Sequence, residues 1–184
     1  MGRSLLLALQ FLTRLPVPSM AAVEERDVGR SLLWYPLVGL FIGLALATLG
    51  WMLISASPIL RAALVLAAWV AITGALHLDG LGDSADAWMG GPGSRERTLA
   101  IMKDPYSGPG AVVVLVMVLL IKFAALETIL VAGDWSLLLL APTLGRVALP
   151  LLFLTTPYVR RGGLGAALAR RLPRRTGVAV VFVS

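Results

Sequence analysis

Four long apolar stretches constrain what this chain can fold into more than any other feature. They cover about Leu32–Ile54, Pro58–Leu76, Gly110–Val131 and Trp135–Thr155. A helix needs about 20 apolar residues to cross a bilayer, and each stretch is near that length. The chain is 58% hydrophobic with a mean hydropathy of +0.88, which is more apolar than a soluble domain of 184 residues needs. The sequence therefore predicts an all-α fold: a polytopic integral membrane helical bundle with about four complete spans.

Two shorter apolar segments lie at the ends of the chain. Residues 4–15 are too short to span and are followed by Pro16 and Pro18, so we expect an interfacial helix there. Val178–Val183 begins a fifth apolar run and is the last such segment of the sequence, which predicts a partial fifth span in a truncated chain or one that ends at the membrane surface. We expect residues 1–184 to form one integral-membrane domain.

The loop charges predict the orientation of the spans. Arginine and lysine gather in residues 1–30, 77–108 and 156–177, whereas the connections near 55–57 and 132–134 carry neither. Because cytoplasmic loops of membrane proteins are enriched in Lys and Arg, the three basic segments are predicted to be cytoplasmic. The same rule explains the sequence pI of about 10.8, so we expect no nucleic-acid partner.

Three aspartates follow the second apolar stretch at helical spacing. Asp79, Asp83 and Asp86 stand at i, i+4 and i+7, which places them on one face if the segment is helical. Carboxylates this close would repel each other unless a cation lies between them, and hard oxygen ligands suit Mg²⁺ or Ca²⁺ better than zinc. The absence of cysteine and the single histidine, His77, also argue against zinc. The alternative is a solvated acidic loop at the membrane surface.

Cationic residues complete a candidate site for phosphates. Lys103 and Asp104 lie in the same basic segment as the aspartates, and Arg146 lies near the middle of the fourth stretch between Pro142 and Pro150. A charge at this depth is costly and usually faces a cavity and a partner. The alternative for Arg146 is a structural ion pair, with Glu127 or with one of the aspartates. Carboxylates for a metal and cations for phosphates are the general equipment of phosphoryl transfer.

Ordered motifs along residues 1–168 resemble the cobalamin synthase family, the membrane enzymes also called adenosylcobinamide-GDP ribazoletransferases. The central match is TGALHLDGLGDSAD at 73–86, which contains all three aspartates. The other matches are ALQFLTRLPVP at 8–18, YPLVGL at 35–40, RER at 95–97, IMKD at 101–104, LAPTLGR at 140–146 and PYVR at 157–160.

The resemblance implies a reaction, partners and residue roles. Adenosylcobinamide-GDP would be joined to α-ribazole, or its 5′-phosphate, with release of GMP, by a Mg²⁺-dependent multi-pass enzyme of the bacterial inner membrane whose site faces the cytoplasm. Membrane lipid is a further partner, and the oligomeric state, homo-oligomers included, stays open. Asp79, Asp83 and Asp86 would hold one or two Mg²⁺ ions, and one of them or His77 would act as base. Lys103, Asp104 and Arg146 would bind substrate.

The direction of His77 makes it a less suitable base than the aspartates. At roughly 100° per residue it points about 160° away from the carboxylate face of an unbroken helix. Two other functions remain open. A CDP-alcohol phosphotransferase would also cluster aspartates, but with a different spacing and an arginine that this motif lacks. A cation transporter would need the carboxylates at mid-membrane between broken helices.

Overall fold

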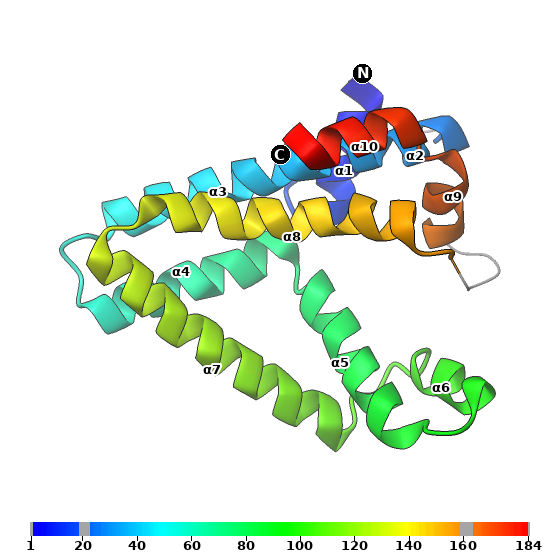
Figure 1. Cartoon of the computed structure of the whole chain (residues 1–184). Helices are drawn as coiled ribbons and strands as arrows, with labels where there is room; N and C mark the ends of the chain where they lie inside the picture. Colours follow the sequence, from blue (N-terminus) through cyan, green and yellow to red (C-terminus); the bar gives the residue numbers. More distant parts are fainter. Residues whose placement is uncertain (1, 19–22, 159–163, 184) are drawn as a thin grey trace. The chain divides into compact units, whose positions relative to one another are not determined.

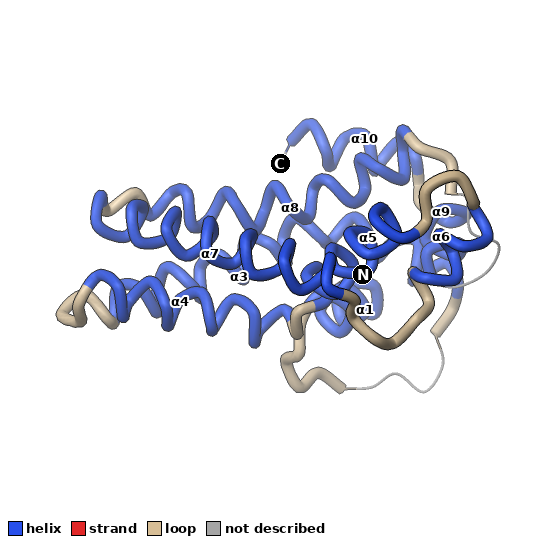
Figure 2. Tube along the Cα trace, turned by 90° about the horizontal axis from the view of Figure 1, so that it is seen from below, coloured by secondary structure: helices blue, strands red, loops and turns tan. Residues whose placement is uncertain are grey.

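The computed structural model describes residues 2–18, 23–158 and 164–183, and every regular element in them is helical (Figures 1 and 2). The prediction of an all-α membrane fold is confirmed. Arg160 and Arg161 of the predicted basic segment 156–177 lie outside the described residues. The helices are α1 (Gly2–Leu12), α2 (Glu25–Ser31), η1 (Leu32–Trp34), α3 (Tyr35–Met52), α4 (Pro58–Thr73), α5 (Leu76–Gly90), α6 (Arg95–Ile101), α7 (Pro109–Ala132), α8 (Trp135–Thr155), α9 (Leu164–Arg171) and α10 (Arg174–Val183).

Three helical segments of the described chain are long and apolar enough to cross a bilayer. They are Glu25–Met52, which runs through α2, η1 and α3, and the single helices α7 and α8. The second predicted span differs, because α4 ends at Thr73 and α5 leaves it at an angle of 86°. The bent pair α4–α5 meets the same criteria when taken together, as a broken span or a re-entrant loop. By length and composition the described chain therefore has three candidate spans, or four if this pair counts as one.

The contacts divide the chain into two compact units. Unit 1 comprises Met1–Ser55 and Gly133–Ser184, and unit 2 comprises Ala56–Ala132. Each unit is described by itself below. The expectation that residues 1–184 form one domain stays a prediction.

Close pairing of α3 and α8 organises unit 1. A Cβ added at Gly39 would lie 2.6 Å from the Pro142 carbonyl oxygen, and one added at Gly43 would lie 2.7 Å from that of Leu138. Only glycine allows two helices to approach this closely, as in other small-xxx-small contacts between spans. Tyr35 and Leu46 are buried along the same face of α3.

The short helices of unit 1 gather at one end of this pair. The 11-residue α1 buries Ala8 and Leu12 against its neighbours, and its Ser4 hydroxyl donates to Asp27 of α2 (3.3 Å). Helix α9 packs against α2, where Arg171 pairs with Glu25 at 3.1 Å. Helix α10 has 10 residues, about half the length of a span.

Unit 2 is built on α7. Figure 1 shows α4 and α5 diverging from their bend, with α7 joining their far ends. Close approach at Gly82, whose added Cβ would lie 3.3 Å from the Ala111 Cβ, packs α5 against the first turns of α7. At the other end, the buried Arg61 guanidinium of α4 donates to the carbonyl of Leu130, in the last turn of α7. In the middle of α7 the Lys122 ammonium lies 3.4 Å from the ring centroid of Trp69 on α4, a cation–π contact.

Candidate functional site

The break between α4 and α5 decides where the aspartate motif begins. Gly74 and Ala75 both have left-handed backbone, with φ of 60° and 57°. Gly74 adopts this conformation without steric cost and is the C-cap of α4. In Ala75 the same conformation costs about 1–2 kcal/mol because of its Cβ. Helix α5 starts directly afterwards, at Leu76, and Asp79 lies in its first turn. The bend therefore ends α4 and starts a separate helix that carries the motif.

The predicted helical spacing of the motif is confirmed, because Asp79, Asp83 and Asp86 all lie in α5. Their surroundings differ. Asp79 is exposed, whereas Asp83 and Asp86 are half-buried. In the described part of the chain, no three His, Asp or Glu side chains are arranged so that they could hold a metal ion together. The three carboxylates share a helix without converging on one point.

Asp86 is engaged by the start of α7. Its Oδ2 accepts a hydrogen bond from the Gly108 N–H at 2.6 Å, and its Oδ1 accepts one from the Ala111 N–H at 2.8 Å. A Cβ added at Gly108 would lie 2.7 Å from Oδ1, and one added at Gly110 would lie 3.0 Å from it. A side chain at Gly108 would displace the carboxylate, whereas at Gly110 the atom nearest to an added Cβ is the Met89 Sδ. The segment Gly108–Gly110 is therefore built around Asp86.

The remaining predicted residues of unit 2 lie on its exposed surface. His77 and Lys103 are both exposed, with His77 in the first turn of α5 and Lys103 just after α6. Asp104 is exposed too, and its Oδ1 accepts a hydrogen bond from the Tyr106 N–H at 3.0 Å. This is an Asx turn, in which the carboxylate shapes the chain that follows Lys103.

Arg146 belongs to unit 1 and is buried there, with 4% of its surface exposed. Its Nη1 lies 3.5 Å from the Pro142 carbonyl, while Nε and Nη2 are buried without a hydrogen-bond partner in the described structure. Pro150 has no N–H to donate to the Arg146 carbonyl, so the helix around this side chain is irregular in its hydrogen bonding. A buried guanidinium with two unpartnered groups is well suited to an anion.

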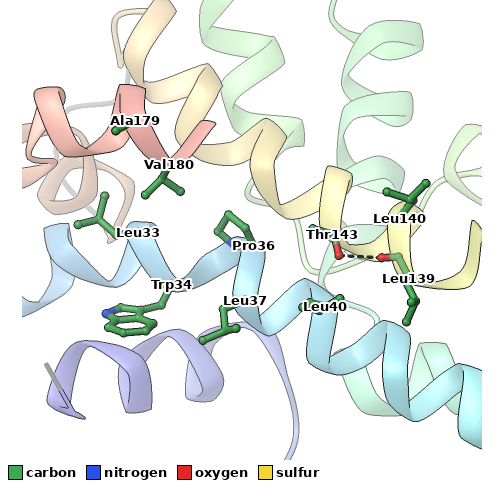
Figure 3. A pocket seen from close by; sticks show the side chains of 10 residues that line it. All are labelled: Leu33, Trp34, Pro36, Leu37, Leu40, Leu139, Leu140, Thr143, Ala179 and Val180. Atoms are coloured by element: carbon green, nitrogen blue, oxygen red, sulfur yellow. Dashed lines mark hydrogen bonds between the residues drawn. The ribbon is translucent and has the colours of Figure 1, made fainter. Parts of the chain in front are cut away.

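Two cavities have contrasting linings. One of about 650 Å³ in unit 1 is walled by apolar side chains of η1, α3, α8 and α10, including Pro36, Leu40 and Val180 (Figure 3). Its Thr143 hydroxyl donates to the Leu139 carbonyl at 2.7 Å and is thus already satisfied. A second, of about 560 Å³ in unit 2, lies between α5 and α6 and is lined by residues that include Ser84 and Arg95. The first cavity therefore offers no charged group for chemistry on phosphates.

Comparison with known proteins decides the family. The family model described as cobalamin-5-phosphate synthase matches residues 4–184. The chain belongs to this family. A protein of Pseudomonas aeruginosa strain PAO1, named adenosylcobinamide-GDP ribazoletransferase, is 61% identical over 182 residues, which are 99% of this chain and 74% of that protein. Proteins with the same name from Stutzerimonas stutzeri A1501 and Pseudomonas putida GB-1 are also 61% identical, over 96% and 92% of this chain and 72% and 71% of theirs. No solved structure matches the chain.

Sequence reasoning missed two features of this family member. Arg61 lies near the start of the second apolar stretch, and its buried hydrogen bond to the Leu130 carbonyl is not predicted by the sequence pattern. The engagement of Asp86 by Gly108 and Ala111 joins residues 22 and 25 positions apart, which no local spacing reveals. The only hint was the pattern Gly108-Pro109-Gly110 directly before an apolar span.

Proposed function

We propose that this chain is an adenosylcobinamide-GDP ribazoletransferase. The observation that carries the proposal is 61% identity over 99% of the chain with a relative of that name. Membership of the cobalamin-5-phosphate synthase family favours this function over the two alternatives, a CDP-alcohol phosphotransferase and a cation transporter. The substrates are adenosylcobinamide-GDP and α-ribazole or its 5′-phosphate.

The reaction is one transfer at phosphorus. A ribose hydroxyl of α-ribazole attacks the phosphorus that carries the cobinamide, and a new O–P bond forms. The O–P bond to the guanosine phosphate breaks, GMP leaves, and the hydroxyl proton goes to a base on the enzyme. The protein must therefore bind a diphosphate, accept one proton and align the hydroxyl with the leaving group.

The chemistry of α5 fits Mg²⁺. Asp79 and Asp83 lie one turn apart on one face of the helix, and Gly80 between them has no neighbouring atom within 4 Å of an added Cβ. Two carboxylates beside open space suit Mg²⁺, which is usually bound by one or two carboxylates together with substrate phosphates and water. When bound, Mg²⁺ would neutralise charge on the attacked phosphorus and on departing GMP.

The chain's own groups then have these proposed roles. A carboxylate oxygen of Asp79 or Asp83 accepts the hydroxyl proton, and His77, on the opposite side of α5, is the second candidate base. Lys103 is an exposed cation for the phosphates, and the Asx turn made by Asp104 orients the segment that follows it. In unit 1, the unpartnered Nε and Nη2 of Arg146 suit an anion.

We also place the protein in the bacterial inner membrane with α5 and α6 facing the cytoplasm, where nucleotides are available. The basic residues of 77–108 and 156–177 support this orientation. Lipid surrounds the apolar faces of α7 and α8, whose exposed side chains include Val113, Ile121 and Leu144. The oligomeric state stays open.

Genetic complementation tests the proposed function. The chain is expressed in a bacterium whose own ribazoletransferase gene is deleted and whose growth requires cobalamin. We expect growth on cobinamide with the wild-type chain and with Asp134→Asn, an exposed aspartate at the start of α8 that makes no capping hydrogen bond. We expect no growth with Asp83→Asn. Failure of a well-expressed wild-type chain to restore growth, with accumulation of adenosylcobinamide-GDP, would contradict the proposal.

A further inference from the structure

We propose that Asp86 is a positioning residue that fixes the motif helix α5 on the start of α7, and that Asp79 and Asp83 alone hold the metal. The inference rests on the proposed function, because it divides the three motif aspartates of that site between two roles. It departs from the expectation that all three carboxylates share one cation.

Asp86 accepts hydrogen bonds from the start of α7, a role that residues next to the helix start usually fill. The first residues of a helix have backbone N–H groups without partners. In a capping box, the side chains of the N-cap residue and of the third helical residue satisfy two of these groups. Helix α7 begins at Pro109, and the Gly108 carbonyl accepts the first helical hydrogen bond, from Val112 at 3.2 Å. Gly108 and Ala111 therefore hold the two capping-box positions, yet neither has a polar side chain.

The two carboxylate oxygens of Asp86 are the acceptors for the Gly108 and Ala111 N–H groups. The carboxylate accepts from the Gly108 N–H at 2.6 Å and from the Ala111 N–H at 2.8 Å. Its negative charge also suits the positive end of the α7 dipole, and the first turn of α7 has no acidic residue of its own. One side chain thus caps α7 and ties it to α5.

The opposite end of α7 is held in the same manner. The buried Arg61 guanidinium on α4 donates to the Leu130 carbonyl in the last turn of α7, where a positive charge is favoured. Because α4 and α5 meet at the bend at Gly74 and Ala75 and each packs against α7, contacts with the two ends of α7 would set the angle at which α5 stands. Losing Asp86 would free α5 to turn and would misdirect the Asp79 and Asp83 face.

The geometry also separates Asp86 from its neighbours in the motif. Both of its oxygens are directed at backbone N–H groups of the α7 start. Among the described residues the side chains of Asp79 and Asp83 make no hydrogen bond or ion pair, and Asp79 is exposed. Two carboxylates with substrate phosphates make an ordinary Mg²⁺ site, so the third aspartate is not needed as a ligand.

Asparagine and alanine substitutions distinguish the two roles. Asparagine has one accepting oxygen where aspartate has two, so it can keep only one of the two hydrogen bonds of Asp86, and it is a poor replacement for a carboxylate ligand. In the full chain in lipid nanodiscs, Asp86→Ala, which loses both hydrogen bonds, should lower kcat by roughly ten- to a hundredfold, as misplacement of reacting groups does, and Asp86→Asn, which can keep one of them, should lower kcat less. Both should leave the Mg²⁺ concentration for half-maximal rate unchanged. Asp83→Asn, the matched variant, should raise that concentration at least about tenfold.

A distance measurement gives a readout that does not depend on activity. Because the chain has no cysteine, spin labels can be placed at Ser84→Cys on α5 and Val113→Cys on α7, both exposed. We expect a narrow distance distribution in the parent and in Asp83→Asn, and a broadened one in Asp86→Ala. If neither the parent nor any variant is active but the distance distributions change as expected, the proposed function is contradicted. The positioning role of Asp86 is then still supported. An Asp86→Asn protein with raised Mg²⁺ demand and an unchanged distance distribution would show that Asp86 is a metal ligand.

Discussion

Replacing Arg146 with methionine should abolish activity and leave the protein as stable as before or more stable. The side chain is 4% exposed, and its one hydrogen bond in the described structure, from Nη1 to the Pro142 carbonyl, is long at 3.5 Å. Its buried Nε and Nη2 have no partner, and each such group costs about 1–3 kcal/mol. Methionine fills similar space without this cost. We therefore expect the free energy of unfolding to stay equal or to rise by about 1–4 kcal/mol, the range seen when buried charges are replaced by apolar side chains.

The assay is thermal unfolding of the substrate-free protein in detergent, followed by tryptophan fluorescence. For a chain of this size each kcal/mol shifts Tm by about 2–4 °C. Arg61→Met is the matched control: Arg61 is also buried, at 7% exposure, but it donates to the Leu130 carbonyl. Its loss leaves that carbonyl without this donor, so its Tm should fall. A fall in the Tm of Arg146→Met as large as that of Arg61→Met would refute the reasoning and make Arg146 a structural residue.

Three further predictions follow from the same structure. Gly39→Ala should lower stability by about 1–3 kcal/mol because its Cβ would meet the α8 backbone, whereas Gly145→Ala, with open space around it, should be neutral or stabilising in the same unfolding assay. Chelation with EDTA should stop GMP release in wild type and added Mg²⁺ should restore it; activity that persists through chelation would contradict the metal proposal. An impermeant thiol reagent applied to intact cells should label Ser55→Cys and spare Glu96→Cys; the reverse pattern would invert the topology.

The sequence was sufficient for features that depend on composition and local spacing. The apolar lengths predicted α7 and α8 almost to their ends. The i, i+4, i+7 spacing placed Asp79, Asp83 and Asp86 together on one helix, as observed.

Two features could not be predicted from composition and local spacing, the bend between α4 and α5 and the different surroundings of the three aspartates. The apolar run continues through residue 76, so nothing in its hydropathy marks the end of α4 at Thr73; the left-handed Gly74 and Ala75 make the bend. Spacing along α5 also treats the three aspartates as equivalent. The difference arises from α7, whose start is built from Gly108-Pro109-Gly110 and draws only Asp86 toward it.

The most direct test of the central claim is the stoichiometry of GMP and joined corrinoid in a single turnover. Purified protein in nanodiscs is mixed with adenosylcobinamide-GDP, α-ribazole 5′-phosphate and Mg²⁺, and both products are quantified. We predict equal amounts of the two from wild type and from Asp134→Asn, and neither product from Asp79→Asn or Asp83→Asn at the same Mg²⁺ concentration. GMP without joined corrinoid, or wild-type rates in both aspartate variants of α5, would contradict the account.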